Sequence, residues 1–452
     1  MAILIKNARY LIQNAEKILE NVDLLIEGNQ ISLIGPDLTA GRDTTIIEAT
    51  GKVVMPGLIN AHTHLYQCFL KARRDDLPFK EWCEEVTFPF TNVIQEDYLQ
   101  RREATAGYYW SLLGAMEMIK GGITCCINMD KTLPSVFQAW LNIGFRGVGA
   151  ITAVNRWVPK ELSLSDEQRK AEILSYIKEW HQVPAESPLV QIFMAPSTPF
   201  ACTKNFLQWL GETAITHDLG LQVHVSENSR DVTLAEEESG LTPLAYLDSL
   251  GLLQQHFTAV HCVYLTAAEM DLARERGVIP VYNPKSNAKL GSGIAPVAEM
   301  LARGLTVAIG TDGAASNDLL DMFEEMRAAT LFQKARYQDA SLLPAGQVLQ
   351  MATVNGARAA RINAGELLPG KLADVIILGL DGPHRGFLHD LLQNIVYCAK
   401  AADVETTIIN GRIIMQDRQL LTVDEAEAKR RAMEIADDIF TRAKGKMLAA
   451  EF

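Results

Sequence analysis

Eight short apolar runs, rich in β-branched residues and separated by longer amphipathic stretches, constrain the fold of this chain most strongly. They lie at residues 53–62, 123–128, 145–152, 189–196, 219–226, 257–263, 278–283 and 305–311. Strands that alternate with helices form a parallel sheet, and eight such strands close a barrel. The pattern therefore predicts an α/β fold built on a (β/α)8 TIM-type barrel. The working residues of such barrels lie at the carboxyl ends of the strands.

Both ends of the chain carry shorter alternating segments, which are typical of antiparallel strands. We predict that residues 1–57 and 367–422 are the two parts of one small β-sandwich domain, and that residues 58–366 form the barrel. The last segment, residues 423–452, is charged and has helical periodicity, so we expect a C-terminal helix there.

The charge and composition exclude several classes of partner. A formal net charge of -13 argues against a nucleic-acid backbone or an anionic membrane surface as a partner. The chain contains no uninterrupted run of about eighteen apolar residues, so no transmembrane helix is expected. Its seven cysteines are scattered and lack CxxC spacing, which favours reduced thiols in the cytoplasm. A small neutral or cationic ligand fits this charge better.

Residues of the metal-ligand type stand at the ends of four predicted strands. They are, in chain order, His62, His64, His224, Glu227, His261 and Asp312. His62 and His64 are two residues apart, so their side chains point to the same side of an extended strand. Each residue alone is compatible with a hydrogen-bonded core histidine or a helix-capping aspartate. Their combination at four strand ends favours a divalent cation such as zinc, which histidine nitrogen binds readily.

The motifs around these residues resemble those of the amidohydrolase superfamily, and in particular its aminohydrolase branch. The resemblance rests on PGLINAHTH, HVSEN, AVHC, NPKSNAKLGSGIAPVAEML, TDGAASND and GKLADVIIL, and it extends over essentially the whole chain. The branch includes guanine and 8-oxoguanine deaminases, adenosylhomocysteine/methylthioadenosine deaminases and triazine hydrolases. The resemblance implies metal ligation by His62, His64, His224 and Asp312, and it also implies a homodimer or larger homo-oligomer.

The fourth predicted strand, LVQIFMAP, has no lysine that could be carboxylated to bridge two metals. The sequence therefore predicts one divalent ion, Zn²⁺ or alternatively Fe²⁺. Such an ion makes a deprotonated water available near pH 7, about the pKa of a metal-activated water. In the mechanism that the resemblance implies, His261 orients the water and Asp312 accepts its proton. Glu227 protonates the ring nitrogen and then the departing amine.

Four further residues are candidate substrate contacts. Gln67 has an amide that both donates and accepts hydrogen bonds, and it resembles a residue of guanine deaminases and triazine hydrolases. Ser197, in APSTPFACT, stands where nucleoside deaminases generally have a histidine. Trp82 is a candidate for stacking on a flat ring, and Arg156 for contact with a substrate anion or a neighbouring subunit. Ordinary packing and a solvated loop arginine are the alternatives for the last two.

We therefore predict hydrolytic deamination of an amino-substituted purine, pterin or s-triazine. Gln67 and Ser197 favour a bare ring, whereas DDLPFKEW and TDGAASNDLLDMFEEMR look closest to adenosylhomocysteine-type enzymes. The alternatives are a nucleoside-type substrate, or loss of chloride or alkylamine from a triazine. Ring opening of a cyclic amide is disfavoured because such enzymes commonly use two bridged metals. An assembly protein without catalysis is disfavoured because every ligand residue is retained.

Overall fold

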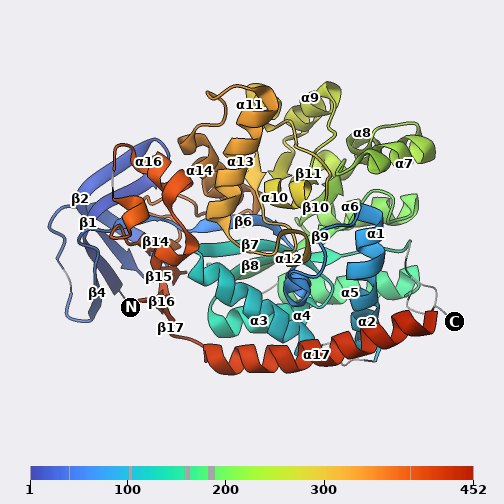
Figure 1. Cartoon of the computed structure of the whole chain (residues 1–452), viewed down its shortest axis with the longest axis horizontal. Helices are drawn as coiled ribbons and strands as arrows, with labels where there is room; N and C mark the ends of the chain where they lie inside the picture. The colour runs from blue at the N-terminus through green and yellow to red at the C-terminus, as the bar shows by residue number, and fades with distance from the viewer. Residues whose placement is uncertain are drawn as a thin grey trace.

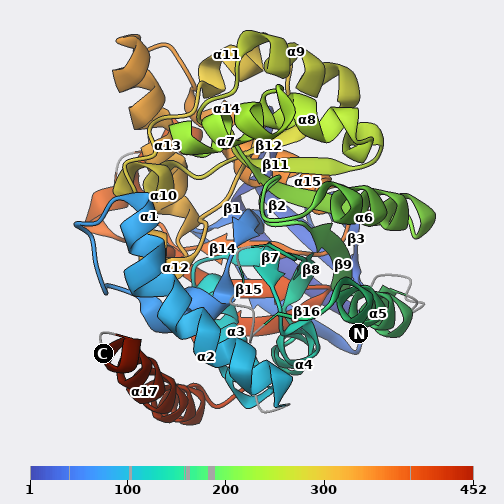
Figure 2. The ribbon, with the colours of Figure 1, turned by 90° about the vertical axis from the view of Figure 1, so that its right-hand side faces the viewer.

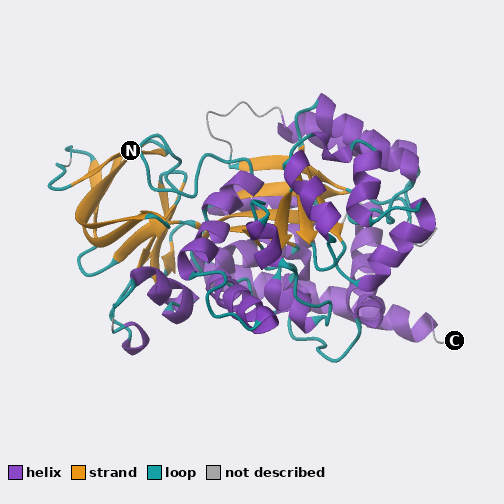
Figure 3. Ribbon diagram, turned by 90° about the horizontal axis from the view of Figure 1, so that it is seen from above, coloured by secondary structure: helices purple, strands orange, loops and turns teal. Residues whose placement is uncertain are grey.

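The chain forms a barrel with an open sheet at one side (Figure 1). The computed structural model describes residues 2–39, 41–100, 104–156, 158, 163–181, 189–386 and 388–450. Figure 3 shows helices surrounding the barrel strands, whereas the sheet of the chain ends lies beside them with few helices against it. Among the described residues, no helix combines the length and apolar character that crossing a membrane requires.

The barrel contains eight strands that pair in parallel, in chain order, as a repeated strand-helix pattern predicts. They are β6 (Leu58–Thr63), β7 (Ile123–Asp130), β8 (Arg146–Thr152), β9 (Val190–Ala195), β10 (Gly220–Val225), β11 (Phe257–His261), β12 (Ile279–Tyr282) and β13 (Ala308–Ile309). The predicted (β/α)8 TIM-type barrel is thus confirmed. Between β13 and β6, the Asp312 amide donates to the His62 carbonyl at 3.0 Å, which holds the first and last strands together.

The first predicted strand, residues 53–62, is in fact two strands that belong to different sheets. β5 (Val53–Pro56) pairs outside the barrel, and β6 begins at Leu58. Gly57 separates them, and its amide donates to the Asp374 carbonyl at 3.0 Å. A Cβ at Gly57 would lie 2.2 Å from Thr124 Oγ1 on β7, so the close approach of the two segments requires glycine. An uninterrupted apolar run therefore crosses from one sheet into the other.

The two ends of the chain form one mixed sheet of nine strands. Its strands are β1 (Ala2–Asn14), β2 (Lys17–Glu27), β3 (Gln30–Gly35), β4 (Thr44–Glu48), β5, β14 (Val375–Leu378), β15 (Val404–Ile409), β16 (Arg412–Gln416) and β17 (Gln419–Leu420). The pairing of β5 with β14, antiparallel with Val53 opposite Leu378, joins the two ends as predicted. Their alternating apolar side chains form a separate buried cluster.

Helices cover the outside of the barrel, and Figure 2 shows them ringed around the central strands. The α-helices are α1 (Phe79–Trp82), α2 (Phe88–Leu99), α3 (Ala104–Lys120), α4 (Leu133–Ile143), α5 (Asp166–Tyr176), α6 (Lys204–Thr216), α7 (Ser229–Ser239), α8 (Pro243–Ser249), α9 (Ala267–Arg276), α10 (Pro284–Lys289), α11 (Val297–Ala302), α12 (Ala314–Asn317), α13 (Met322–Tyr337), α14 (Ala345–Ala352), α15 (Val354–Ala359), α16 (Leu391–Gln393) and α17 (Glu425–Ala450). Short 3-10 or π-helical turns are η1 (Leu65–Leu70), η2 (Cys83–Thr87), η4 (Ile177–His181), η5 (Leu252–Gln254), η6 (Pro383–Arg385), η7 (Asn394–Cys398) and η8 (Ala401–Asp403).

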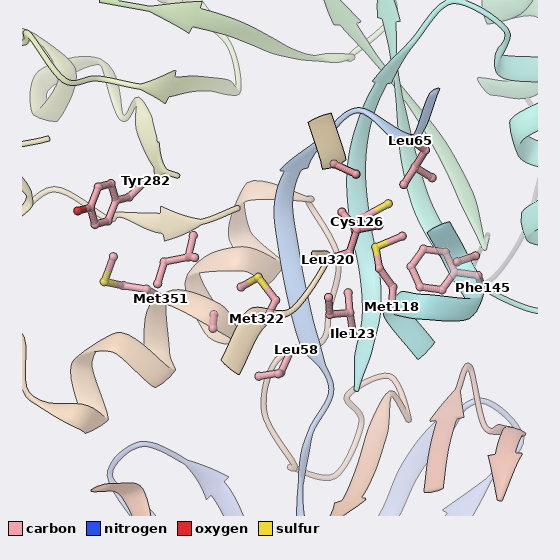
Figure 4. Close-up of a cluster of buried hydrophobic side chains, with 14 of the residues drawn as sticks. Leu58, Leu65, Met118, Ile123, Cys126, Phe145, Tyr282, Leu320, Met322 and Met351 are labelled. Carbon is pink, nitrogen blue, oxygen red and sulfur yellow. The ribbon is translucent and has the colours of Figure 1, made fainter. Parts of the chain in front are cut away.

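The main core lies between the barrel strands and these helices. Leu58 and Ile123 from adjacent strands meet Met118 from α3 in this layer, close to Cys126 and Phe145 (Figure 4). All five side chains are buried, and each contributes on the order of 1.5–3 kcal/mol through removal of apolar surface from water. This packing fixes the strands, and therefore the side chains at their ends.

The C-terminal helix α17 lies along α2 and α3 at the side of the barrel (Figure 1). Arg442 makes a bidentate ion pair with Asp97 of α2, with both N–O distances 2.7 Å. At the other end, Lys120 Nζ donates to Glu425 Oε2 at 2.7 Å. The charged helix anticipated at the end of the chain is thus docked against the helices that follow the first barrel strand.

Candidate metal centre and active site

Four potential ligand atoms converge at the carboxyl ends of β6, β10 and β13. His224 Nε2 lies 3.3 Å from His62 Nε2 and 3.3 Å from His64 Nε2. Asp312 Oδ1 lies 3.3 Å from His62 Nε2 and 3.5 Å from His64 Nε2. Two ligands placed about 2.0–2.1 Å from a tetrahedral ion are about 3.3–3.4 Å apart, so these residues fit one divalent cation. His261 joins the same centre, its donor atom within 4.8 Å of those of His62 and His224.

Each of the four histidines donates a hydrogen bond from its Nδ1–H to an oxygen atom. The Nδ1–H pairs are His62 with Gln222 Oε1 at 2.8 Å, His64 with Met129 O at 3.0 Å, His224 with Ser197 O at 2.8 Å, and His261 with Asn287 Oδ1 at 2.9 Å. These acceptors place the hydrogen on Nδ1 and leave the Nε2 lone pair for a metal or a water. Gln222 is oriented in turn because its Nε2 donates to Ala61 O at 3.0 Å.

The buried setting favours the neutral form of three of these imidazoles, those of His64, His224 and His261. Burial, with the neighbouring His62, lowers the pKa of His64 to about 4, and burial likewise lowers the pKa of His261 to about 4. The pKa of His224 lies well below its usual range for the same reason. Burial opposes ionisation of Asp312, but hydrogen bonding to His62 and the other imidazoles hold the pKa of its carboxyl well below the ordinary value. The centre thus combines neutral nitrogen donors with a carboxylate, as a zinc-type site requires.

The backbone turns sharply where the strands end. Ser197, Ser226, His261 and Asp312 have φ angles of 42°, 52°, 71° and 61°. Residues other than glycine rarely adopt this left-handed conformation, and it persists only where the surroundings enforce it. For Asp312 the surroundings include Ser286 Oγ and Ser316 Oγ, which donate to Oδ2 at 2.6 Å and 3.0 Å. These turns direct the end residues over the mouth of the barrel.

Glu227 lies beside the imidazole cluster, two residues beyond the end of β10. Its Oε2 is 3.7 Å from His261 Nε2. Burial, together with the nearby carboxylates of Asp231 and Asp312, raises the pKa of Glu227 well above its usual range. This shift favours the protonated carboxyl, which suits a general acid. The structure brings all six predicted metal and catalytic residues together in one place.

A pocket opens next to this cluster, over the ends of β6 to β9. Its lining residues are His64, Tyr66, Thr91, Ile94, Trp110, Met129, Asp130, Lys131, Thr152 and Ser197. Ser197, one of the four predicted substrate contacts, is among them, and its carbonyl also orients His224. Aromatic and aliphatic walls next to convergent polar groups are typical of a small-molecule site.

The other three predicted contacts, Gln67, Trp82 and Arg156, are hydrogen-bonded, buried or ion-paired within the protein. Gln67 Oε1 accepts from the Ala315 amide at 3.2 Å, and a Cβ at Gly313 would meet that oxygen at 1.9 Å. Trp82 is 6% exposed on α1, and its Nε1 has no hydrogen-bond partner among the described residues. Arg156 forms a bidentate pair with Glu238 of α7, at 2.8 Å and 2.7 Å. Their contact with substrate stays a prediction.

The residues that orient the ligands were not predicted from the sequence. Gln222 could have been found, because it precedes His224 by two residues and therefore points to the same side of β10. Asn287 and the carbonyls of Met129 and Ser197 had no such signal. Their role depends on how distant strand ends meet.

Comparison with known proteins agrees with this geometry. The model of the Amidohydrolase family matches residues 53–414. The 5′-deoxyadenosine deaminase of Methanothermobacter thermautotrophicus is 38% identical over 397 residues, covering 88% of this chain and 90% of the relative. The 5-methylthioadenosine/S-adenosylhomocysteine deaminase of Thermococcus sibiricus is 37% identical over 417 residues, covering 92% and 94%. A zinc-bound adenosine deaminase structure from Xanthomonas campestris has a TM-score of 0.89 at 29% identity, covering 97% and 98%.

Proposed function

Since this chain belongs to the amidohydrolase family, as its motifs indicated, we propose that it is a metal-dependent hydrolytic deaminase of an amino-substituted nitrogen heterocycle, with 5′-substituted adenosines as its substrates. One observation carries the proposal. Three imidazole nitrogens and the Asp312 carboxylate converge within ligand distance of one another, and the Glu227 carboxyl, whose pKa burial raises, lies beside them. The names of the relatives at 37–38% identity support the same chemistry.

The proposed metal ligands are His62, His64, His224 and Asp312. A divalent cation held there supplies Lewis-acid activation of water at neutral pH. We propose zinc, because nitrogen-rich donor sets with one carboxylate bind it well and because the Xanthomonas structure contains it. Ferrous iron is the alternative that the same donors accept.

The chain's own residues handle the protons. Glu227 gives its proton to the ring nitrogen next to the amino-bearing carbon. It then takes up the proton of the newly added hydroxyl and passes it to the departing amine, and the proton held by Asp312 restores the acid form of Glu227. His261, whose Nε2 faces Glu227 Oε2 at 3.7 Å, orients the attacking water. Asp312 accepts the proton of that water, while Ser286 and Ser316 hold its other carboxylate oxygen. Proton transfer of this kind contributes about 10²- to 10⁴-fold in rate.

The bare-ring interpretation is a second candidate. The small Ser197 side chain lines the pocket, which agrees with that interpretation, but the Gln67 amide is already hydrogen-bonded to Ala315. The relatives named above are deaminases of adenosine derivatives, so these compounds come first. Guanine, 8-oxoguanine, isoxanthopterin and melamine represent the bare rings.

Ammonia release from this panel by zinc-loaded protein tests the proposal. We expect release from 5′-deoxyadenosine, methylthioadenosine or adenosylhomocysteine, with one metal ion per chain. Release from bare rings alone would move the substrate to the second candidate. No ammonia from any compound by metal-loaded protein would contradict a deaminase.

The oligomeric state, location and partner expected from the sequence are also part of the proposal. We propose a homodimer or larger homo-oligomer in the cytoplasm, with a small heterocycle rather than nucleic acid as its partner. Light scattering coupled to gel filtration measures the first of these. A mass of a single chain, 49.9 kDa, at micromolar concentration would contradict it.

A further inference from the structure

One basic side chain in the pocket, that of Lys131, makes few hydrogen bonds within the described part of the protein. Lys131 directly follows β7 and lines the same pocket as His64 and Ser197. Among the described residues, its Nζ makes one long hydrogen bond, 3.5 Å to Gln95 Oε1, and no carboxylate oxygen lies within 4.0 Å. An ammonium group has three N–H donors, so most of its bonding capacity is available to a ligand.

Gln95 adds a second unused donor at the same place. This residue of α2 is 3% exposed, and its Nε2 has no partner among the described residues. Burying such donors without acceptors destabilises the protein. Burial also lowers the pKa of Lys131 to about 8, reinforced by Arg169 and opposed by Asp130. An acceptor group that entered the pocket would relieve these costs.

The neighbouring carboxylates are engaged elsewhere. Asp130 Oδ1 accepts from the amides of Lys131 and Thr132 at 2.7 Å and 3.0 Å, and its Oδ2 accepts from Trp110 Nε1 at 3.1 Å. The nearby Arg169 is paired with Glu172, at 2.6 Å. The carboxylate oxygens of Asp130 and Glu172 that are named here therefore accept from other donors. Among the described residues, Lys131 has no carboxylate partner within ion-pair distance.

The arrangement of the pocket suits an elongated substrate. His64 and Ser197 connect the pocket to the metal centre, while Tyr66, Trp110, Ile94 and Met129 supply aromatic and aliphatic walls. Lys131 follows β7, and His64 follows the neighbouring strand β6. A heterocycle at the metal centre could thus extend a substituent past these walls to the ammonium group.

We propose that Lys131, supported by Gln95, binds a carboxylate on the substrate and makes this enzyme prefer adenosine derivatives whose 5′ substituent carries a carboxylate. Lys131 is then a specificity-determining residue. The inference rests on the proposed function and narrows its substrate class. Adenosylhomocysteine carries such a carboxylate, and methylthioadenosine, with a similar thioether, does not.

The test compares kcat/KM for these two compounds in the wild-type holoenzyme, Lys131→Met and Lys131→Arg. We expect wild type to prefer adenosylhomocysteine. Lys131→Met should lose about 10- to 100-fold on that compound, the range of a charge-assisted hydrogen bond, and less than about threefold on methylthioadenosine. Lys131→Arg should restore part of the loss. Lys170→Met on α5, whose ammonium lies 5.3 Å from the centre of the Trp209 ring, is the matched control and should change neither value.

A binding measurement separates recognition from chemistry. Calorimetry on Glu227→Gln should show adenosylhomocysteine binding that weakens when Lys131→Met is added, with methylthioadenosine binding unchanged. Retained activity on methylthioadenosine shows that Lys131→Met is folded. Equal losses on both compounds, or no loss on either, would overturn the carboxylate site and leave the deaminase intact. If wild type neither binds nor deaminates either compound, the adenosine proposal and this inference fail together.

Discussion

The two ends of the barrel both contain charged groups and histidines, but they use them differently. At the amino-terminal end, Arg146 on β8 makes a bidentate ion pair with Asp374 at 2.7 Å and 3.1 Å, and Asn410 Oδ1 accepts from the same guanidinium at 3.0 Å. His256, also at this end, binds the Ala359 carbonyl at 2.8 Å. These groups are paired within the protein and join the barrel to its surroundings.

At the carboxyl-terminal end, each buried histidine of the cluster has a hydrogen-bond partner for only one of its two ring nitrogens that does not belong to the cluster itself. Each histidine of the cluster uses Nδ1 within the protein and directs Nε2 to a shared point. Left-handed turns at His261 and Asp312 add backbone strain there. Burial of polar groups alone therefore does not identify a site, whereas buried donors and acceptors left open toward one point do.

Substitution of His64 tests this difference most severely. We expect His64→Ala to lose bound metal and to reduce activity to background, because one of the four converging ligands is removed. The matched control at the opposite end, His256→Ala, should keep its metal. Metal per chain by mass spectrometry, with circular dichroism to verify folding, measures both. Metal loss in His256→Ala would contradict the conclusion that only the carboxyl-terminal end of the barrel binds the metal.

Substitution of Glu227 should separate chemistry from metal binding. Glu227→Gln keeps the shape of the side chain but cannot cycle a proton, so turnover should fall about 10²- to 10⁴-fold with metal content unchanged. Glu236→Gln, exposed on α7, is the control and should retain activity. Ammonia release at saturating substrate is the measurement. Near-normal turnover in Glu227→Gln would remove this residue from the mechanism.

The ion pair at the amino-terminal end should affect stability instead. Asp374→Ala leaves the Arg146 guanidinium buried without its carboxylate, which costs about 3–5 kcal/mol of unfolding free energy. The double variant Arg146→Met/Asp374→Leu should recover most of that loss. Denaturant unfolding reports the stability, and metal content at low temperature should remain that of wild type. A metal-depleted but fully stable Asp374→Ala would reverse our assignment of the two ends.

The smallest loss of metal affinity or activity is expected from substitution of Gln222, which orients a proposed ligand but does not itself contact the metal. Gln222→Ala removes the acceptor of His62 Nδ1, so metal affinity or activity should fall about 10- to 100-fold while the ligand itself remains. Competition with a chelator measures the affinity. Wild-type affinity in this variant would show that His62 needs no orienting partner.

Much of the fold and the candidate site was predictable. The eight strands follow from local apolar patterning, and membership of the amidohydrolase family confirms the resemblance of the motifs. The division of residues 53–62 into β5 and β6 was missed, because an apolar run looks the same whichever sheet its residues join. Gly57 marked the position, but its meaning appears only where it packs against Thr124.

By itself, the sequence determined the number of strands, the residues at their ends and the chemistry that those residues can perform. Periodicity and residue type are local properties, and they survive without a partner. Which atoms meet follows from the folded chain: His62 meets Gln222, His224 meets the Ser197 carbonyl, and Lys131 has no carboxylate within ion-pair distance among the described residues. Such contacts depend on barrel closure and strand register, which bring together side chains far apart in the chain.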